Sequence, residues 1–174
     1  TFPRGKAREK NIIFSNQETE MNTQYLGGIN IEQFNTKNNN VRKPDYYINN
    51  SDLKKVKIHE DGYTNRKIIY QNLMSSKPRI VATIDQEERP NDDTVNNLLL
   101  NNESFTYEYI VAILNSHLAT FYLKYMVINN AELTVHLDGQ YVGQIPIKCP
   151  TEEENKKITE LVNILLIDYS VEIH

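Results

Sequence analysis

Three short apolar runs lie in KIIYQNLMSSKPRIVATIDQEERPNDDTVNNLLL, residues 67–100. The first two, 67–71 and 79–84, are rich in β-branched residues and are separated by a joint of Ser, Lys and Pro. This composition and length are typical of buried β-strands, and the polar joint suits the turn between them. The third run, 94–100, follows an acidic, Asn-rich link. The stretch therefore predicts a strand pair with a third strand.

C-terminal to this stretch, the spacing of apolar residues changes to that of a helix. The pattern over about 106–126 predicts one long core helix, whose apolar positions are Ile110, Ile113, Leu114, Leu118, Phe121, Tyr122 and Tyr125. A second helix is expected over about 151–167. It begins with Thr151 and Glu154 in a capping box, and its apolar face holds Ile158, Leu161, Val162 and Leu165. Between the helices, QIPIKCP predicts an edge strand, because Pro146 cannot donate to a ladder.

The N-terminal part is more polar. Residues 1–24 predict a tail or leading segment with one apolar island at 11–14, and residues 25–174 predict a single domain. Gly27 and Gly28 indicate a tight turn before a strand that contains Ile29 and Ile31. A short strand is expected at 46–48 between Asn clusters, and residues 53–63 fit either a helical turn or a strand. The fold class is α/β in the α+β sense, with a mixed, largely antiparallel sheet.

Composition limits the kinds of protein that this chain can be. Its 174 residues are 39% hydrophobic and 24% charged, which suits one soluble domain. No apolar run reaches the roughly 20 residues of a membrane span, and no signal peptide is visible. The single cysteine, Cys149, excludes an internal disulfide and a multi-cysteine zinc site. We expect a cytoplasmic protein without membrane contact. The chain starts without Met, as a fragment would.

Charge is divided unevenly along the chain. The net charge is −4, yet residues 1–84 carry 14 Lys and Arg against 8 Asp and Glu, whereas residues 85–174 carry 5 against 15. The local field determines where a polyanion can dock, so the basic half remains compatible with DNA. Solvated loops that are rich in Asn and Lys are the simpler alternative.

Few residue patterns indicate catalysis or metal binding. The histidines show no metal-ligand spacing, and no phosphate-binding glycine loop occurs, so we expect neither a metal nor a bound cofactor in this chain. Asp45, Asp52 and Lys54 approximate the pattern of Mg²⁺-dependent nucleases, which remains the lesser alternative. Cys149 would need a histidine base to act as a nucleophile, and a small, buried or half-buried side chain is the simpler expectation.

Taken in order, several segments resemble the TaqI-like C-terminal specificity domain of N6-adenine DNA methyltransferases and type IIG restriction-modification enzymes. They are YLGGINIEQF, KIIYQNLMSSKPRIVATID, DDTVNNLLL, YIVAILNSHLATFYLKYM and VGQIPIKCPTEEENKKITELVNILL. The resemblance covers roughly residues 25–166. Gly27 stands where that family usually has a basic residue. The resemblance implies a target recognition domain for duplex DNA, with catalysis and S-adenosylmethionine binding in an upstream methyltransferase domain.

The chain lacks the catalytic signature of those enzymes, since it contains no Pro-Pro dipeptide. We therefore expect no catalytic residue here, although the activity of the fragment itself stays open. A protein-interaction domain of a restriction-modification complex is the main alternative.

Cationic and polar side chains on loops are the natural DNA contacts. The candidates are Arg42, Lys43, Arg66, Lys67, Ser75, Ser76, Lys77 and Arg79. Arg79 could instead pair with Asp85 or a neighbouring carboxylate and only stabilise the hairpin. Asn115 and Ser116 are expected to satisfy nearby backbone groups rather than to contact DNA.

Overall fold

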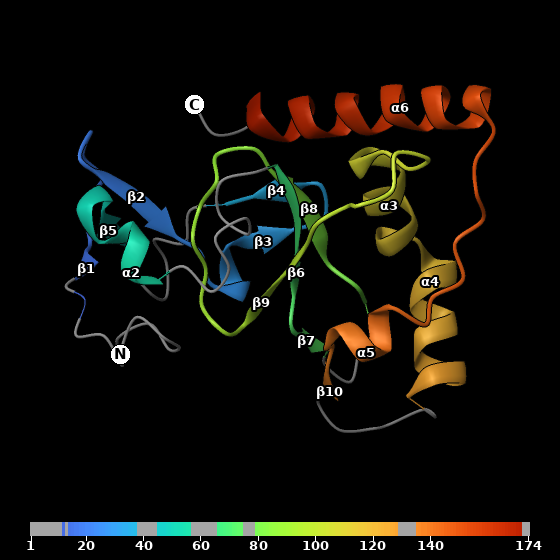
Figure 1. Cartoon of the computed structure of the whole chain (residues 1–174), viewed down its shortest axis with the longest axis horizontal. Helices are drawn as coiled ribbons and strands as arrows, with labels where there is room; N and C mark the ends of the chain where they lie inside the picture. Colours follow the sequence, from blue (N-terminus) through green and yellow to red (C-terminus); the bar gives the residue numbers. More distant parts are fainter. Residues whose placement is uncertain are drawn as a thin grey trace.

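The computed structural model describes residues 12, 14–37, 45–56, 66–74, 79–128 and 135–171. Two sheet regions lie side by side; the longer helices cover the larger one, whereas only the short α2 lies beside the smaller one (Figure 1). Both sheets are antiparallel, which confirms the α+β class.

The larger sheet is built from the three predicted runs. Strand β6 (Lys67–Gln71) lies between β8 (Ala82–Asp85) and β9 (Val95–Leu98), and pairs antiparallel with both. Strand β8 begins three residues later than predicted. The Ile80 amide donates to the Thr120 hydroxyl at 3.2 Å, so a helix side chain replaces a strand partner there.

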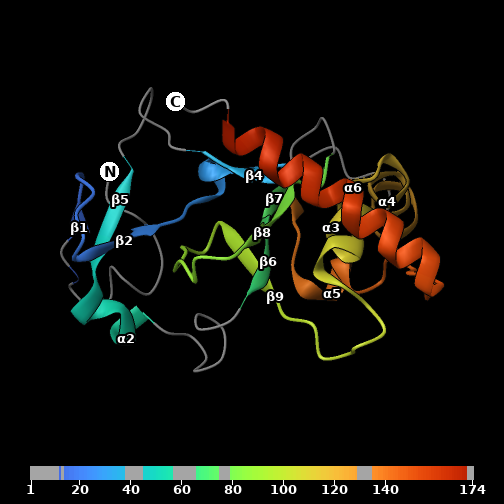
Figure 2. The same cartoon turned by 90° about the horizontal axis from the view of Figure 1, so that it is seen from above.

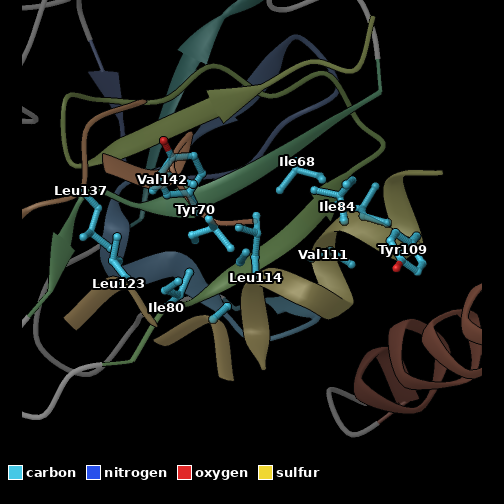
Figure 3. Close-up of a cluster of buried hydrophobic side chains, with 14 of the residues drawn as sticks. Ile68, Tyr70, Ile80, Ile84, Tyr109, Val111, Leu114, Leu123, Leu137 and Val142 are labelled. Atoms are coloured by element: carbon cyan, nitrogen blue, oxygen red, sulfur yellow. The ribbon is translucent and has the colours of Figure 1, made fainter. Parts of the chain in front are cut away.

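Side chains of β6 alternate between two apolar clusters, as the pleat of a strand requires. Ile68 and Tyr70 belong to the main core, together with residues of the helices that cover one face of the sheet (Figure 3). Ile69 belongs to the cluster on the opposite face, with Leu26 and Ile31. The central strand is therefore buried on both faces, which explains its continuous apolar sequence.

The predicted single helix over 106–126 is wrong in its continuity. Helix α3 (Tyr107–Asn115) ends at Ser116. The chain bends there by 58°, and the next helical segment consists of α4 (His117–Tyr122) followed by a π-helical turn, η3 (Leu123–Val127). Ser116 has extended backbone angles, and its hydroxyl accepts from the Ala119 amide at 3.0 Å while donating to the Ile113 carbonyl at 2.7 Å. This hydroxyl ends one helix and caps the next.

The bend also changes which apolar residues are buried. Ile110 and Leu114 of α3 pack in the core, as expected. Leu118, Phe121 and Tyr125 lie beyond the bend and are exposed, so assigning them to the core was wrong. A periodic pattern cannot reveal a change of helix direction, because it fixes only the spacing of side chains.

Helix α6 (Glu152–Val171) packs on α3 and forms an outer layer over it (Figure 2). Its capping box is confirmed: the Glu154 amide donates to the Thr151 hydroxyl at 3.2 Å, and the Thr151 amide donates to the Glu154 carboxylate at 2.9 Å. Val162 is buried against the core, whereas Leu161 and Leu165 are exposed. The predicted apolar face is thus correct only in part.

The predicted edge strand at 144–150 is absent. After α5 (Gly139–Val142), the chain runs past α3, and the Tyr109 hydroxyl donates to the Lys148 carbonyl at 3.0 Å. Pro146 and Pro150 supply no backbone donor for a ladder. Cys149 is exposed in this segment, contrary to expectation. The neighbouring ladder instead joins β7 (Leu73–Met74) and β10 (Val135–His136).

The smaller sheet places β5 (Tyr46–Asn49) between β1 (Phe14–Ser15) and β2 (Asn22–Tyr25), around Ile12, Tyr25 and Ile48. Strand β2 crosses the predicted boundary at residue 24. The remaining short elements are η1 (Gly28–Asn30), β3 (Ile31–Glu32), β4 (Asn35–Thr36), η2 (Asn50–Asp52) and α2 (Leu53–Val56). Residues 53–56 thus form a helical turn, whereas 57–63 lie outside the described residues.

The two sheet regions meet where Leu26 bridges Asn91. The Leu26 amide donates to the Pro90 carbonyl at 2.8 Å, and the Asp92 amide donates back to the Leu26 carbonyl at 2.9 Å. Next to this bridge, the Gly28 amide donates to the Thr94 hydroxyl at 2.7 Å. The two backbones lie close together here, so the missing side chain of Gly28 serves close packing rather than an unusual turn.

No single helix within the described ranges has the length and apolar character of a membrane span; only α3 and the bent segment after it pass that test, and only when they are taken together.

We predict that Gly28→Ala lowers the free energy of unfolding by roughly 1–3 kcal/mol, because the new Cβ atom would overpack a close contact between backbones. That atom would lie 3.0 Å from the Thr94 carbonyl oxygen. Gly139→Ala is the matched control, since its Cβ would meet nothing within 4 Å. Urea unfolding of both variants measures the difference. Equal stability of the two variants would contradict the proposed close packing.

Candidate nucleic-acid interface

The predicted DNA contacts fall into two groups. Arg42, Lys43, Ser75, Ser76 and Lys77 lie outside the described residues. Arg66, Lys67 and Arg79 are described, and their surroundings differ strongly. These three show which cations of the basic half remain available to a polyanion.

Lys67 is fully buried, so its selection as a DNA contact was wrong for this structure. Its ammonium lies 3.0 Å from the Asp85 carboxylate and donates to the Arg89 carbonyl at 3.0 Å. Both side chains of the ion pair have 0% exposure. A buried ammonium has to be paired, and Asp85 lies directly opposite Lys67 in the ladder. The lysine therefore serves to neutralise the buried Asp85 carboxylate.

Arg89 completes this ion network and was missed in the sequence, where DQEER was considered only as part of an acidic link. Its Nε donates to Asp85 at 2.9 Å, and its Nη atoms donate to Gln24 at 3.2 Å and to Thr36 at 3.1 Å. The spacing of Asp85 and Arg89, four residues apart, was the available signal. The guanidinium ties the larger sheet to β2 and β4.

Arg66 is committed to the first turn of α3. Its guanidinium pairs with the Glu108 carboxylate and lies 5.4 Å from the centre of the Tyr107 ring. The arginine side chain is 41% exposed, whereas that of Glu108 is only 6% exposed. An ion pair that shields a buried carboxylate is costly to break, so this cation is held by the protein. Its contact with DNA stays a prediction.

Arg79 is exposed, and its side chain makes no ion pair or hydrogen bond to any part of the chain that the structure describes. The alternative pairing with Asp85 is wrong, because Asp85 is bound by Lys67 and Arg89. The next residue, Ile80, is fully buried in the core. An exposed guanidinium thus begins at a firmly anchored point of the backbone, which is the geometry that recognition of a base edge needs.

Asn30 fixes both ends of the segment 38–44. Its side-chain amide donates to the Lys37 carbonyl at 3.1 Å and to the Asp45 carboxylate at 2.7 Å, and its own oxygen accepts from the Gly27 amide at 2.9 Å. Asn30 is buried. Sequence reasoning did not select it, because an asparagine before a strand is common. The points where this segment leaves and rejoins the fold are therefore set by one side chain.

Two hollows flank Tyr47 on the smaller sheet. One, of about 390 Å³, is lined by Glu18, Asn22, Thr23, Gln24, Tyr47, Glu87 and Arg89; the other, of about 380 Å³, is lined by Phe14, Ser15, Thr19, Asn22, Tyr47, Asn49, Ser51 and Asp52. Burial raises the pKa of the Tyr47 hydroxyl, and the carboxylates of Glu18 and Asp45 raise it further. The hydroxyl thus remains protonated at neutral pH. The carboxylates that line the hollows, Glu18 and Glu87 in the first and Asp52 in the second, make them unsuited to phosphate.

The metal-nuclease alternative gains no support from the described geometry. Asp45 is buried and accepts from Asn30, and Asp52 pairs with Lys55 at 2.6 Å. The Lys54 side chain lies outside the described residues. No group of three or more His, Cys, Asp or Glu side chains suited to a metal occurs within the described ranges.

A family model described as a TaqI-like C-terminal specificity domain matches residues 23–147. This range contains the larger sheet, the bent helix pair and the ion network, and it contains β5 and most of β2 of the smaller sheet, whereas β1 lies before it. No curated protein matches the chain.

We predict that Lys67→Met lowers the free energy of unfolding by roughly 3 kcal/mol, since it removes one partner of a buried ion pair. DNA affinity measured well below the unfolding temperature should be unchanged. Lys148→Met is the control, because Lys148 pairs with Glu154 at the exposed surface, where solvent screens the pair, and its loss should change stability far less. Unaltered stability together with weaker DNA binding would show that Lys67 reaches DNA.

Proposed function

Because the chain belongs to the family of TaqI-like C-terminal specificity domains, we propose that it recognises a short duplex DNA sequence for an N6-adenine DNA methyltransferase or a type IIG restriction-modification enzyme. Membership in this family makes it a DNA-recognition domain of the methyltransferase and restriction group. The adenine target and the type IIG architecture are the finer parts of the proposal. Adenine chemistry and S-adenosylmethionine binding belong to a methyltransferase domain of the same protein, and the proposed location is the cytoplasm.

The observation that supports the proposal most strongly is the exposure of the Arg79 side chain. Arg79 is exposed and its side chain makes no hydrogen bond or ion pair within the described ranges, while its neighbour Ile80 is buried. A guanidinium can donate two parallel hydrogen bonds to O6 and N7 of guanine in the major groove. Its delocalised charge and fixed planar shape suit that contact better than an ammonium does. Arg79 is therefore the proposed base-reading residue.

Phosphate contacts are assigned to the cations on the flanking segments. Arg42, Lys43 and Lys77 are the proposed contacts of this kind, because phosphate binding needs charge but little geometric precision. Ser75 and Ser76 could donate to phosphate or base acceptors. This division explains how an acidic chain can bind DNA, because the acidic side chains are concentrated in the other half of the sequence.

A second role, contact with the methyltransferase domain, is favoured by exposed apolar side chains on α4 and η3. Leu118, Phe121, Tyr125 and Met126 are 77%, 56%, 47% and 69% exposed. The Phe121 and Tyr125 rings lie 4.7 Å apart, and residues 109–131 contain no Asp or Glu. Aromatic residues and Met are enriched in protein interfaces, whose cores are poor in charge. The domain that a specificity domain serves is the proposed occupant.

We predict that Arg79→Ala weakens binding to the cognate duplex by roughly 1–3 kcal/mol and relaxes the preference at one base pair. Arg79→Lys should retain non-specific affinity, because it keeps the charge, and should lose the same preference. Fluorescence anisotropy at several salt concentrations measures both terms. Wild-type affinity should fall steeply between about 50 and 200 mM salt.

Two outcomes would contradict this function. If no duplex is bound at any salt concentration, DNA recognition is wrong and the protein contact of α4 becomes the function. If Arg79→Ala keeps the wild-type preference, base recognition by Arg79 is wrong even though the chain binds DNA.

A further inference from the structure

The backbone that leads from Arg79 into β8 is held by polar side chains that come from elsewhere in the chain. Asn115 and Thr120, on either side of the helix bend, bond Ala82 and Ile80. Gln33, which follows β3, bonds the Ile80 carbonyl. These three residues, which we call the polar clamp, all bond the backbone between Arg79 and β8, at Ile80 or Ala82.

Asn115 acts as a substitute for a neighbouring strand. Its Oδ1 accepts from the Ala82 amide at 2.9 Å, and its Nδ2 donates to the Ala82 carbonyl at 2.9 Å. The asparagine is 9% exposed, so water competes little for these bonds. This pairing confirms that Asn115 satisfies backbone groups. It also locates those groups three residues beyond Arg79.

Thr120 and Gln33 hold the residue next to Arg79. The Thr120 hydroxyl accepts from the Ile80 amide at 3.2 Å. The Gln33 amide donates to the Ile80 carbonyl at 3.0 Å and to the Asn115 carbonyl at 3.1 Å, so it ties the strand to the end of α3. Both polar groups of the Ile80 backbone are thereby fixed, and the Ile80 side chain is buried. The position of the Arg79 Cα atom depends on these contacts.

We propose that the polar clamp is a specificity device, in which Asn115, Thr120 and Gln33 position Arg79 for base recognition. This inference rests on the proposed function. A bidentate contact tolerates only small errors in position, and groups that bond the backbone beside the contact determine that position. The bend at Ser116 is part of the device, because α3 must end there to aim Asn115 at Ala82 while α4 carries Thr120 to Ile80.

Thr120→Val is the most informative variant, because it removes one hydrogen bond at nearly constant volume. The readout is the set of sequences that the intact protein selects from randomised duplexes, with the thermal midpoint measured in parallel. We expect the ratio of cognate to non-specific affinity to fall by roughly 5-fold or more, at the base pair that Arg79→Ala also affects. Thr120→Ser keeps the hydroxyl and should restore the wild-type preference.

Thr159→Val is the matched control. The Thr159 hydroxyl lies 3.2 Å from that of Thr106, where α6 packs on α3, so the same substitution removes a comparable bond on a different contact. It should lower the thermal midpoint to a similar extent and leave the selected sequences unchanged. A merely structural role of Thr120 would make the two variants behave alike.

The outcomes separate this inference from the proposed function. Relaxed preference in Thr120→Val, restored in Thr120→Ser and absent in Thr159→Val, supports the polar clamp. Unchanged preference in Thr120→Val, with relaxed preference in Arg79→Ala, overturns the clamp and retains the function. Unchanged preference in both overturns the clamp together with the role of Arg79, and a wild-type protein that selects no sequence overturns the function itself.

Discussion

The rest of the structure depends on the burial of one carboxylate, that of Asp85 at the end of β8. It has 0% exposure and is bound by Lys67 on the opposite strand and by Arg89 four residues further on. An unpaired charge in this place would cost several kcal/mol, so both cations must stay. Arg89 also bonds Gln24 of β2 and Thr36 of β4. The arginine that neutralises Asp85 therefore links the larger sheet to the smaller sheet and to the β3–β4 pair.

This constraint changes how the basic half of the sequence is understood. Lys67 is buried in an ion pair with Asp85, and Arg66 is paired with Glu108. The positive charge of each is therefore offset by a carboxylate and adds little to the electrostatic field at the surface. Arg79 differs because Asp85, the nearest carboxylate in the sequence, is already bound twice. The buried network thereby leaves Arg79 exposed without a competing partner inside the described structure. Counting charges along a sequence cannot separate these roles, because burial depends on tertiary packing.

Local signals predicted much of the fold. The β-branched runs gave the antiparallel pair, Thr151 and Glu154 gave the start of α6, and the ordered segments gave a family that the match over residues 23–147 confirms. Non-local bonds account for the failures. The helix bends at Ser116, next to Asn115, whose side chain bonds Ala82 of a distant strand, and Lys67 is buried because Asp85 lies opposite it. Of the candidate site, only the exposure of Arg79 followed from the sequence, through its position at the start of the predicted run 79–84, although β8 itself begins at Ala82.

The central claim is that a guanidinium held beside a buried strand recognises one guanine. Affinity for cognate duplexes in which each guanine in turn is replaced by 7-deazaguanine tests it most directly, because this base lacks the N7 acceptor and keeps its pairing. For the wild-type protein, we predict a loss of about tenfold at a single guanine, and for Arg79→Ala no further loss at that position. Equal losses in the two proteins at every guanine would contradict the account.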